Sequence, residues 1–177
     1  MSGRLENLEF LFVTGPNSKD SIFSNLPKFR HLYFKSTSRI SEDWIIPQTH
    51  SLETLSGVLV CDLDDEKILR CFPHLRHLKC NYDYSWINDC PDLSFLPQLE
   101  SIRMTFYSLQ EDHFPTLERL VLESCNFLKS IPSELGYIPT LQMIEVHSCG
   151  KIVRESAMKI KEEQEENGNE ELKVIMV

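Results

Sequence analysis

An apolar motif recurs along most of the chain and constrains its fold more than any other feature. Most copies follow the pattern apolar-Pro-x-Leu-x-x-Leu-x-apolar, and the seven copies read LENLEFLFV, LPKFRHLYF, HSLETLSGV, FPHLRHLKC, LPQLESIRM, FPTLERLVL and IPTLQMIEV. Their anchor residues are Leu8, Phe29, Leu52, Leu75, Leu99, Leu117 and Leu141. The anchors are 21, 23, 23, 24, 18 and 24 residues apart, which is the period of leucine-rich repeats. In the third copy a second frame, through Leu55, Val58 and Val60, also fits.

The motif predicts a solenoid. Its last two apolar residues lie on one side of a short strand, and the residues flanking them point to the other side. Parallel strands stacked about 4.8 Å apart bury the apolar side that one strand leaves exposed. We therefore predict an α/β leucine-rich-repeat solenoid of about seven irregular repeats, with a curved parallel sheet on the concave face. Short helices and irregular segments, such as residues 64–71 and 128–139, form the convex face.

Residues 152–177 have the pattern of a cap on the repeats of residues 1–151, within the same domain. Apolar residues recur there at near-helical spacing, at Ile152, Val153, Ala157 and Ile160, and EEQEEN supplies a solvated face. Asn167-Gly168-Asn169 is typical of a helix end. The following LKVIMV predicts a strand that pairs beside the seventh repeat and closes that end.

Charge and hydropathy exclude several partner classes. The 177 residues carry a formal charge of −9, of which residues 155–171 contribute −5 through seven glutamates and two lysines. A nucleic-acid-binding face would need to be basic, so we expect no nucleic-acid partner. No apolar run reaches the roughly 20 residues of a membrane helix, and the N-terminus lacks a signal peptide's cleavage site. We expect a cytoplasmic protein whose six cysteines are free thiols.

The stretch CFPHLRHLKC has four potential zinc ligands at an even spacing of three: Cys71, His74, His77 and Cys80. The repeat frame points Leu78 and Cys80 inward and His77 and Lys79 outward. A single ion cannot reach both faces of one strand, and tetrahedral zinc usually takes paired ligands from two turns. We therefore expect no bound metal.

Other chemical motifs are also incomplete. GPNSKDS (15–21) lacks the second glycine and the Gly-Lys-Ser/Thr ending of a phosphate loop. Cys125 and Cys149 each follow their repeat anchor by eight residues, where such repeats place a buried Asn or Cys that bonds neighbouring backbone. We expect neither catalysis nor a cofactor, although triads assemble across a fold and a sequence does not exclude one.

The stretch FPTLERLVLESCNFLKSIPSELGYIPTLQMIEVHSCGKIVRESA (114–157) resembles the C-terminal end of a particular leucine-rich-repeat domain. That domain belongs to plant intracellular nucleotide-binding immune receptors of the coiled-coil class, typified by late blight resistance proteins. Ile-Pro-x-x-Leu-Gly at 131–136 matches the plant-type convex signature, and LPKFRHLYF, THSLETLSGV and DDEKILRCFPHLRHLKC each resemble a unit of the family. The tail SAMKIKEEQEENGNEELKVIMV resembles the family's usual ending.

The resemblance implies a recognition role. In such receptors the repeats bind a pathogen effector or a guarded host protein and hold the nucleotide-binding part inactive. The coiled coil, phosphate loop and Met-His-Asp signature of these receptors do not occur in this sequence. We therefore expect either a cut-out repeat domain, with the nucleotide-binding domain of the same receptor as a partner, or a truncated relative. The alternative is a generic leucine-rich-repeat adaptor, such as the substrate-recruiting arm of a ubiquitin ligase.

Outward strand positions are the candidate protein-binding surface, because solenoids commonly bind through the rigid concave sheet. The expected binding residues are His31, Tyr33, Lys35, His77, Lys79, Asn81, Arg103, Arg119, Glu145 and His147. Tyrosine and arginine are enriched at binding hot spots. A second contact loop is predicted at Tyr82, Tyr84 and Trp86, whose aromatic side chains alternatively fold back onto the core.

The first strand, LEFLFV, is apolar at almost every position, with Phe10 and Phe12 outward beside inward Leu8, Leu11 and Val13. Solenoids normally protect a terminal unit with a polar cap, because an open strand edge recruits other chains. Only MSGR precedes this strand and its Leu5-Glu-Asn lead. We therefore expect self-association through the N-terminal edge.

Overall fold

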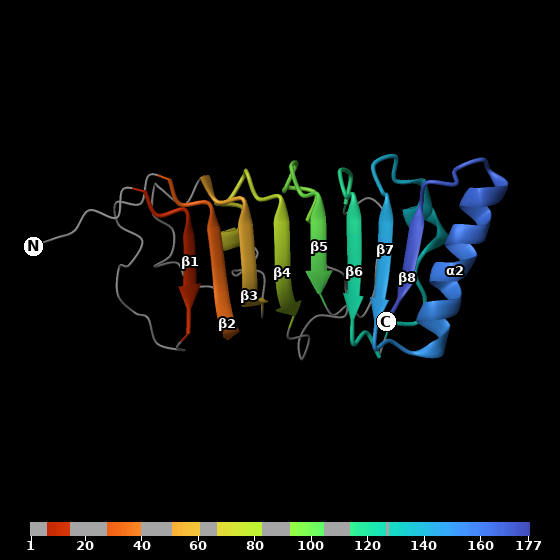
Figure 1. Cartoon of the computed structure of the whole chain (residues 1–177), viewed down its shortest axis with the longest axis horizontal. Helices are drawn as coiled ribbons and strands as arrows, with labels where there is room; N and C mark the ends of the chain where they lie inside the picture. The colour runs from red at the N-terminus through yellow and green to blue at the C-terminus, as the bar shows by residue number, and fades with distance from the viewer. Residues whose placement is uncertain are drawn as a thin grey trace, which may run out of the picture. The chain divides into compact units, whose positions relative to one another are not determined.

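A computed structural model describes residues 7–14, 28–39, 51–60, 67–82, 93–104, 114–126 and 128–177. The chain divides into two compact units, Met1–Trp86 and Ile87–Val177. Each unit contains a series of parallel strands that lie side by side in chain order (Figure 1). The parallel β-solenoid predicted from the repeats is therefore the observed fold class.

The first unit has four described strands: β1 (Phe10–Val13), β2 (His31–Arg39), β3 (Thr54–Val60) and β4 (His77–Tyr82). Each pairs in parallel with the next. One row across the sheet contains Phe10, His31, Thr54 and His77, and the next contains Phe12, Tyr33, Ser56 and Lys79. All eight are positions that the repeat frame predicts to point outward.

The opposite side of these strands forms the core of the first unit. The register aligns Leu32, Leu55 and Leu78, and all three are buried. The anchors Phe29, Leu52 and Leu75 are completely buried beneath the chain that enters each strand. On the return path, residues 67–69 are helical, and Ile68 and Leu69 complete the core. The repeat frame of this unit is confirmed.

Strand β3 uses both frames that the sequence allows in the third repeat. Leu55 is buried in the first frame, and Val58 and Val60 are buried in the second. Gly57, at a φ of 79°, lies between them where the pairing with β4 shifts by one residue. This bulge takes up one extra residue, so the apolar side chains on both sides of it point inward.

The second unit also has four described strands: β5 (Ser101–Met104), β6 (Arg119–Glu123), β7 (Met143–His147) and β8 (Lys173–Met176). They pair in parallel in that order. Ile102, Leu120 and Ile144 are aligned in the register and completely buried. Their row is the centre of the second core.

Hydroxyl groups connect successive coils at an equivalent position in three repeats. The residue before the anchor donates a hydrogen bond to the carbonyl oxygen of the preceding anchor. In the first unit Ser51 donates to Phe29 (3.1 Å). In the second unit Thr116 donates to Leu99 (3.2 Å) and Thr140 to Leu117 (2.9 Å). These bonds provide a donor for backbone carbonyls that are not used in the pairing of the strands.

A helix and a strand follow the seventh repeat, as predicted. Helix α2 (Lys151–Glu166) buries Val153, Ala157, Ile160 and Gln164 on one face and runs alongside β8 in Figure 1. It packs against η4 (Ser133–Tyr137), the 3-10 segment of the convex side. A Cβ on Gly136 of η4 would lie 2.7 Å from Ile160 Cγ2, so the absence of a side chain there allows this close packing.

Two details of the predicted helix are wrong. The pattern places Ile152 on the apolar face, but Ile152 is 64% exposed, because it lies about 100° around the helix from Val153. The pattern places Gln164 on the solvated face, but Gln164 is buried. Its side-chain oxygen accepts a hydrogen bond from Asn169 Nδ2 (3.0 Å) and its backbone oxygen one from Asn169 N (2.8 Å). The predicted helix end is confirmed, since Gly168 has a φ of 85°.

The predicted facing of the histidine-cysteine stretch is confirmed. Leu75, Leu78 and Cys80 are buried, whereas His77 and Lys79 are exposed. Burial raises the pKa of the Cys80 thiol far above its usual range. Within the described ranges, no three histidine, cysteine, aspartate or glutamate side chains are grouped as a metal ion would require. The stretch GPNSKDS lies outside the described residues.

Candidate functional site

We call the outward side of the sheet the open face. In the first unit it consists of Phe10, Phe12, His31, Tyr33, Lys35, Thr54, Ser56, Leu59, His77, Lys79 and Asn81. In the second unit it consists of Ser101, Arg103, Arg119, Val121, Glu123, Met143, Glu145, His147, Lys173 and Ile175. All ten binding residues predicted from sequence lie on one or other of these two sets. The loop residues Tyr84 and Trp86 and the side chain of Tyr82 lie outside the described part.

Two aromatic stacks cover β1 and β2 on the open face of the first unit. The rings of Phe10 and His31 are 4.3 Å apart and inclined by 17°. Those of Phe12 and Tyr33 are 4.8 Å apart and inclined by 12°. Phe10 is 49% exposed and Phe12 is 70% exposed. Large aromatic rings held in place while still facing solvent are typical of protein contact sites.

Most of the remaining positions of this open face are hydroxyl-bearing or basic. His31 Nδ1 is hydrogen-bonded to Thr54 Oγ1 at 3.0 Å, which positions its ring. Lys35 and His77 are exposed, and the side chain of neither makes a hydrogen bond or ion pair with another described residue. Along the strand starts, an ion pair joins Arg30 to Glu53. The described strand positions of this face include no carboxylate.

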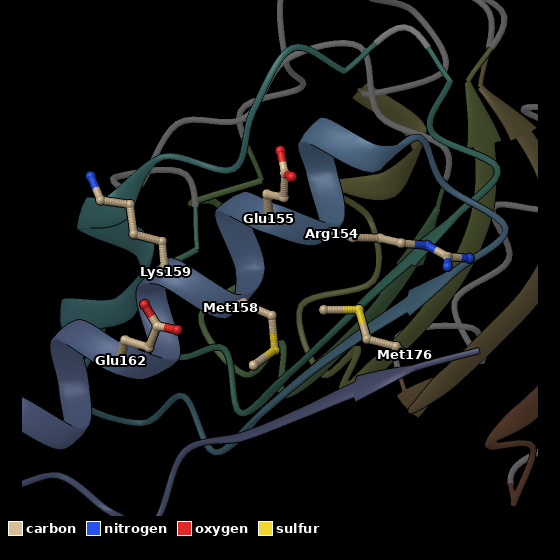
Figure 2. A pocket seen from close by; sticks show the side chains of 6 residues that line it. All are labelled: Arg154, Glu155, Met158, Lys159, Glu162 and Met176. Carbon is tan, nitrogen blue, oxygen red and sulfur yellow. The ribbon is translucent and has the colours of Figure 1, made fainter.

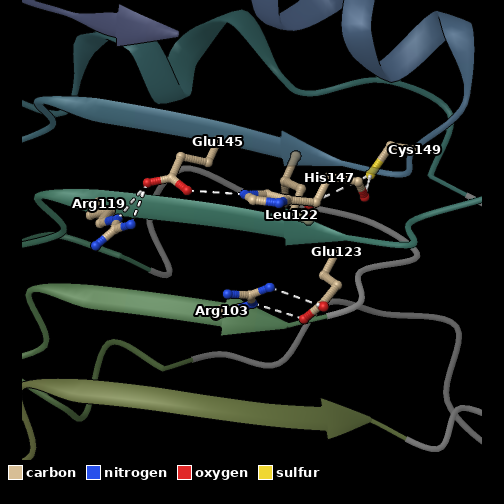
Figure 3. Close-up of polar contacts among 7 residues, drawn as sticks. All are labelled: Arg103, Arg119, Leu122, Glu123, Glu145, His147 and Cys149. Carbon is tan, nitrogen blue, oxygen red and sulfur yellow. Dashed lines mark hydrogen bonds and ion pairs between the residues drawn. The ribbon is translucent and has the colours of Figure 1, made fainter. Parts of the chain in front are cut away.

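The open face of the second unit differs because its arginines are paired within the chain (Figure 3). Arg103 donates from Nε to Glu123 Oε2 at 2.8 Å and from Nη2 to Oε1 at 3.0 Å. The pair is diagonal, since Arg103 stands opposite Val121 in the register. The hydrogen bonds to Glu123 raise the pKa of Arg103 above its usual value. Two bonds in a fork hold both side chains in one orientation.

A second ionic group links β6 and β7. Arg119 Nε donates to Glu145 Oε1 at 2.8 Å, and the other carboxylate oxygen is 3.0 Å from His147 Nε2. Glu145 is only 7% exposed. Burial by itself would raise the pKa of Glu145, but the hydrogen bonds with His147 and Arg119 outweigh it and hold that pKa below the usual value.

The lowered pKa of Glu145 predicts a specific acid sensitivity. Its ionised form contributes stability above the unfolded pKa of about 4.3, and that contribution is lost as the pH falls through the lower folded value. Urea denaturation at pH 7 and at pH 3 should therefore show a smaller difference in unfolding free energy for Glu145→Gln than for the wild type. Glu162→Gln, on the exposed face of α2, should keep the wild-type difference. Equal differences in all three proteins would contradict the assignment.

Three outward positions are buried although the repeat frame places them on the open face. Thr54 is covered beside His31, Glu145 is enclosed by Arg119 and His147, and Val121 is only 3% exposed. Val121 stands in the register between Arg103 and Glu145. Long charged side chains cover apolar neighbours with their methylene stems, so an outward direction does not ensure exposure.

The predicted structural role of Cys125 and Cys149 is confirmed. The backbone N–H of Cys125 donates to Cys149 Sγ at 3.4 Å. The Cys149 thiol in turn lies 3.3 Å from the carbonyl oxygen of His147 and 3.6 Å from that of Leu122 (Figure 3). Both side chains are buried. The sulfur of Cys149 thus forms hydrogen bonds with backbone groups at the ends of β6 and β7.

A hollow of about 330 Å³ lies between α2 and β8. Figure 2 shows Met158 and Met176 facing each other across it. Arg154, Glu155, Lys159 and Glu162 surround them. Two cations and two anions leave this rim without net charge, so it offers no electrostatic preference for a ligand.

The binding residues predicted from sequence omit Phe10, Phe12 and Glu123. Phe10 and Phe12 occupy outward positions of the first repeat, and their size and alternation are a signal that points to the contact surface. Glu123 lies on the same face and forms hydrogen bonds with Arg103, but no spacing in the sequence links the two residues.

In the part of the chain that the structure describes, no helix is long and apolar enough to cross a membrane.

No protein-family model matches the chain. Among curated proteins, it is 35% identical over 126 residues to the putative late blight resistance protein homolog R1B-23 of Solanum demissum. That alignment covers 65% of this chain and 10% of the relative. The homolog R1B-12 of the same organism aligns over 98% of this chain at 29% identity, which is 15% of its own length. The homolog R1B-16 is 39% identical over 87 residues, which are 46% of this chain and 7% of the relative.

The chain therefore spans only a small part of the length of these relatives, 15% in the longest of the three alignments. The alignment with R1B-12 takes in the repeats that form the parallel strands of both units. Repeat period, fold and sequence identity agree. The chain is similar in sequence to late blight resistance protein homologs, and its parallel solenoid fits a leucine-rich-repeat domain.

Proposed function

We propose that the chain is the protein-recognition module of a plant disease-resistance receptor of the nucleotide-binding leucine-rich-repeat class. It senses a pathogen effector or a guarded host protein in the cytoplasm, and it restrains the nucleotide-binding switch. It acts by binding rather than by catalysis. The observation that carries the proposal is the pair of exposed aromatic stacks, Phe10 on His31 and Phe12 on Tyr33, on a sheet face.

A parallel sheet suits recognition because its strands are held on both sides and its side chains occupy a fixed lattice. Aromatic side chains bury much area on binding at little entropic cost, since they have two rotatable bonds. The relatives are named as putative late blight resistance protein homologs, which supports a role in disease resistance. Sensing and restraint are two uses of one surface, and each has its own test.

For sensing, we expect a partner to co-precipitate with the tagged chain from leaf tissue, and its yield to change after inoculation with the late blight pathogen. The variant Phe12→Ser/Tyr33→Ser should lose most of that partner, because both rings of one stack are removed. Glu162→Ala on α2 is the matched control and should retain it. Identical partner sets for the wild type and the aromatic variant would contradict the proposal.

For restraint, the chain should associate with the nucleotide-binding part of a receptor of this class when the two are expressed as separate polypeptides. Cell death caused by an autoactive form of that part should then decrease in proportion to the amount of repeat chain. The aromatic variant identifies whether the open face of the first unit makes this contact. If cell death is undiminished at high levels of the repeat chain, the chain does not restrain the nucleotide-binding part, and only the sensing role remains.

A further inference from the structure

We infer that the open face of the first unit recognises an acidic protein segment that also carries an aromatic or large apolar side chain. The inference rests on the proposed function and identifies the chemistry of its partner. It follows from the order of residue types across the four strands of this unit. The face of the second unit lacks that order.

The two rows across the first sheet have the same composition from β1 to β4. One row reads Phe10, His31, Thr54, His77, and the other reads Phe12, Tyr33, Ser56, Lys79. Each begins with two rings, continues with a small hydroxyl residue and ends with a basic side chain. An aromatic group and a basic group therefore lie two to three strands apart, which is roughly 10–14 Å at about 4.8 Å per strand.

The aromatic end of each row is prepared for an apolar contact. The rings of Phe10 and Phe12 stack on the ring of the next strand within 5 Å, yet both remain about half exposed or more. A partner's ring or aliphatic chain placed on them would remove this surface from water without first having to order it. Binding to a surface that is ordered beforehand costs less entropy.

Two basic side chains of this face, Lys35 beside Tyr33 and His77 on β4, make no ion pair with the other described residues. The charged positions at the strand starts alternate in sign, as Glu9, Arg30, Glu53 and Arg76, and contribute no net charge. The charged side chains at the described strand positions of this face are thus Lys35 and Lys79, both positive, in a chain of net charge −9.

That contrast determines where an acidic partner would bind. The overall negative charge repels it from most of the surface, while Lys35 and its neighbours attract it to one face. The second unit competes poorly, because Arg103 and Arg119 already have Glu123 and Glu145 as partners. An incoming carboxylate there would have to replace an ion pair that is already formed.

Selection from a displayed library of random twelve-residue peptides on the full-length chain tests the inference. The enriched peptides should be more acidic and richer in aromatic residues than the input library. Enrichment of basic or uncharged peptides would overturn the inference, and so would an absence of enrichment.

The enriched peptides are then synthesised with a fluorescent label, and their affinities are measured by anisotropy. Lys35→Glu should weaken binding by about tenfold, as for a hot-spot side chain, and Phe12→Ser should do the same. Lys151→Glu on α2 makes the same charge change at an exposed site that is not part of the open face, and it should change affinity less than about twofold. Equal losses for Lys35→Glu and Lys151→Glu would mean that only the total charge matters, which contradicts a site on the open face.

This experiment separates failure of the inference from failure of the proposed function. If the leaf partner depends on Phe12 and Tyr33 but the selected peptides are not acidic, the recognition role stands and the partner chemistry is wrong. If acidic peptides bind but no leaf partner depends on Phe12 and Tyr33, the partner chemistry stands and the recognition role is wrong.

Discussion

Gly57→Ala should lower the unfolding free energy of the protein more than alanine at any other described glycine. The backbone at Gly57 has a φ of 79°, which is costly for any residue with a Cβ. An ideal Cβ there would also lie 2.3 Å from the carbonyl oxygen of Phe34. The close atom belongs to the backbone of β2, so relief requires the two strands to move apart. We expect a loss of about 2–4 kcal/mol, measured by urea denaturation followed by circular dichroism.

Gly168→Ala is the matched control for this prediction. Gly168 has nearly the same φ, 85°, but a Cβ built on it meets no atom within 4 Å. Its loss should be about 1–2 kcal/mol, the cost of the left-handed backbone alone. The difference between the two variants measures the clash with Phe34. Equal losses would show that the strands adjust freely around the bulge.

Leu120→Ala should cost roughly 2–5 kcal/mol of unfolding free energy, because it empties a completely buried position at the centre of the second unit. Ile102 and Ile144 flank Leu120 in the register and are themselves completely buried. Both belong to paired strands, which limits how far the core can collapse into the space. Chemical denaturation reports the loss as a lower midpoint.

Ile152→Ala provides the comparison for Leu120→Ala. It removes a side chain of similar size from a site that is 64% exposed, and alanine favours the helix more than isoleucine does. We expect a change within about 0.5 kcal/mol of zero. A midpoint for Leu120→Ala as high as that of Ile152→Ala would mean that the repeat frame of the second unit is misplaced.

The strands could be predicted from the sequence because the repeat motif is short and specifies which side chains of each strand are buried. Leucines at fixed offsets identify the side of each strand that is buried, and Leu78, Leu120 and Ile144 lie there as expected. The helix and strand after the seventh repeat were predictable for the same reason. Cys125 and Cys149 could be assigned to backbone bonding from their offset to the anchors, without knowledge of the partners.

What could not be predicted depends on contacts between repeats. The ion pair of Arg103 with Glu123 joins residues 20 positions apart and depends on the register of β5 with β6. The burial of Val121 likewise depends on which neighbouring side chains extend over it. Gln164 was misplaced for another reason: it continues the helical spacing of Val153, Ala157 and Ile160, but its polar side chain suggested the solvated face. Alternation along a strand predicts the direction in which a side chain points, whereas its exposure depends on the neighbouring side chains.

The candidate site was therefore predicted in outline only. The sheet face was identified, and its residues were assigned to it correctly by alternation. The difference between the two units was not visible, because His77 and Arg119 are both basic outward residues in the sequence. The fold gives Arg119 a carboxylate partner on the next strand, and it gives His77 none among the described residues.

The bulge in β3 also has a consequence for how such a chain diversifies. A one-residue insertion in a strand normally exchanges its two sides and would expose the core. With the extra residue looped out at Gly57, Val58 and Val60 still point inward, while Leu59 takes an outward place opposite Asn81. Insertions of this kind change which side chains a partner meets from that point onward. A solenoid that accommodates them can acquire new recognition surfaces through changes in length as well as through substitution, without rebuilding its interior.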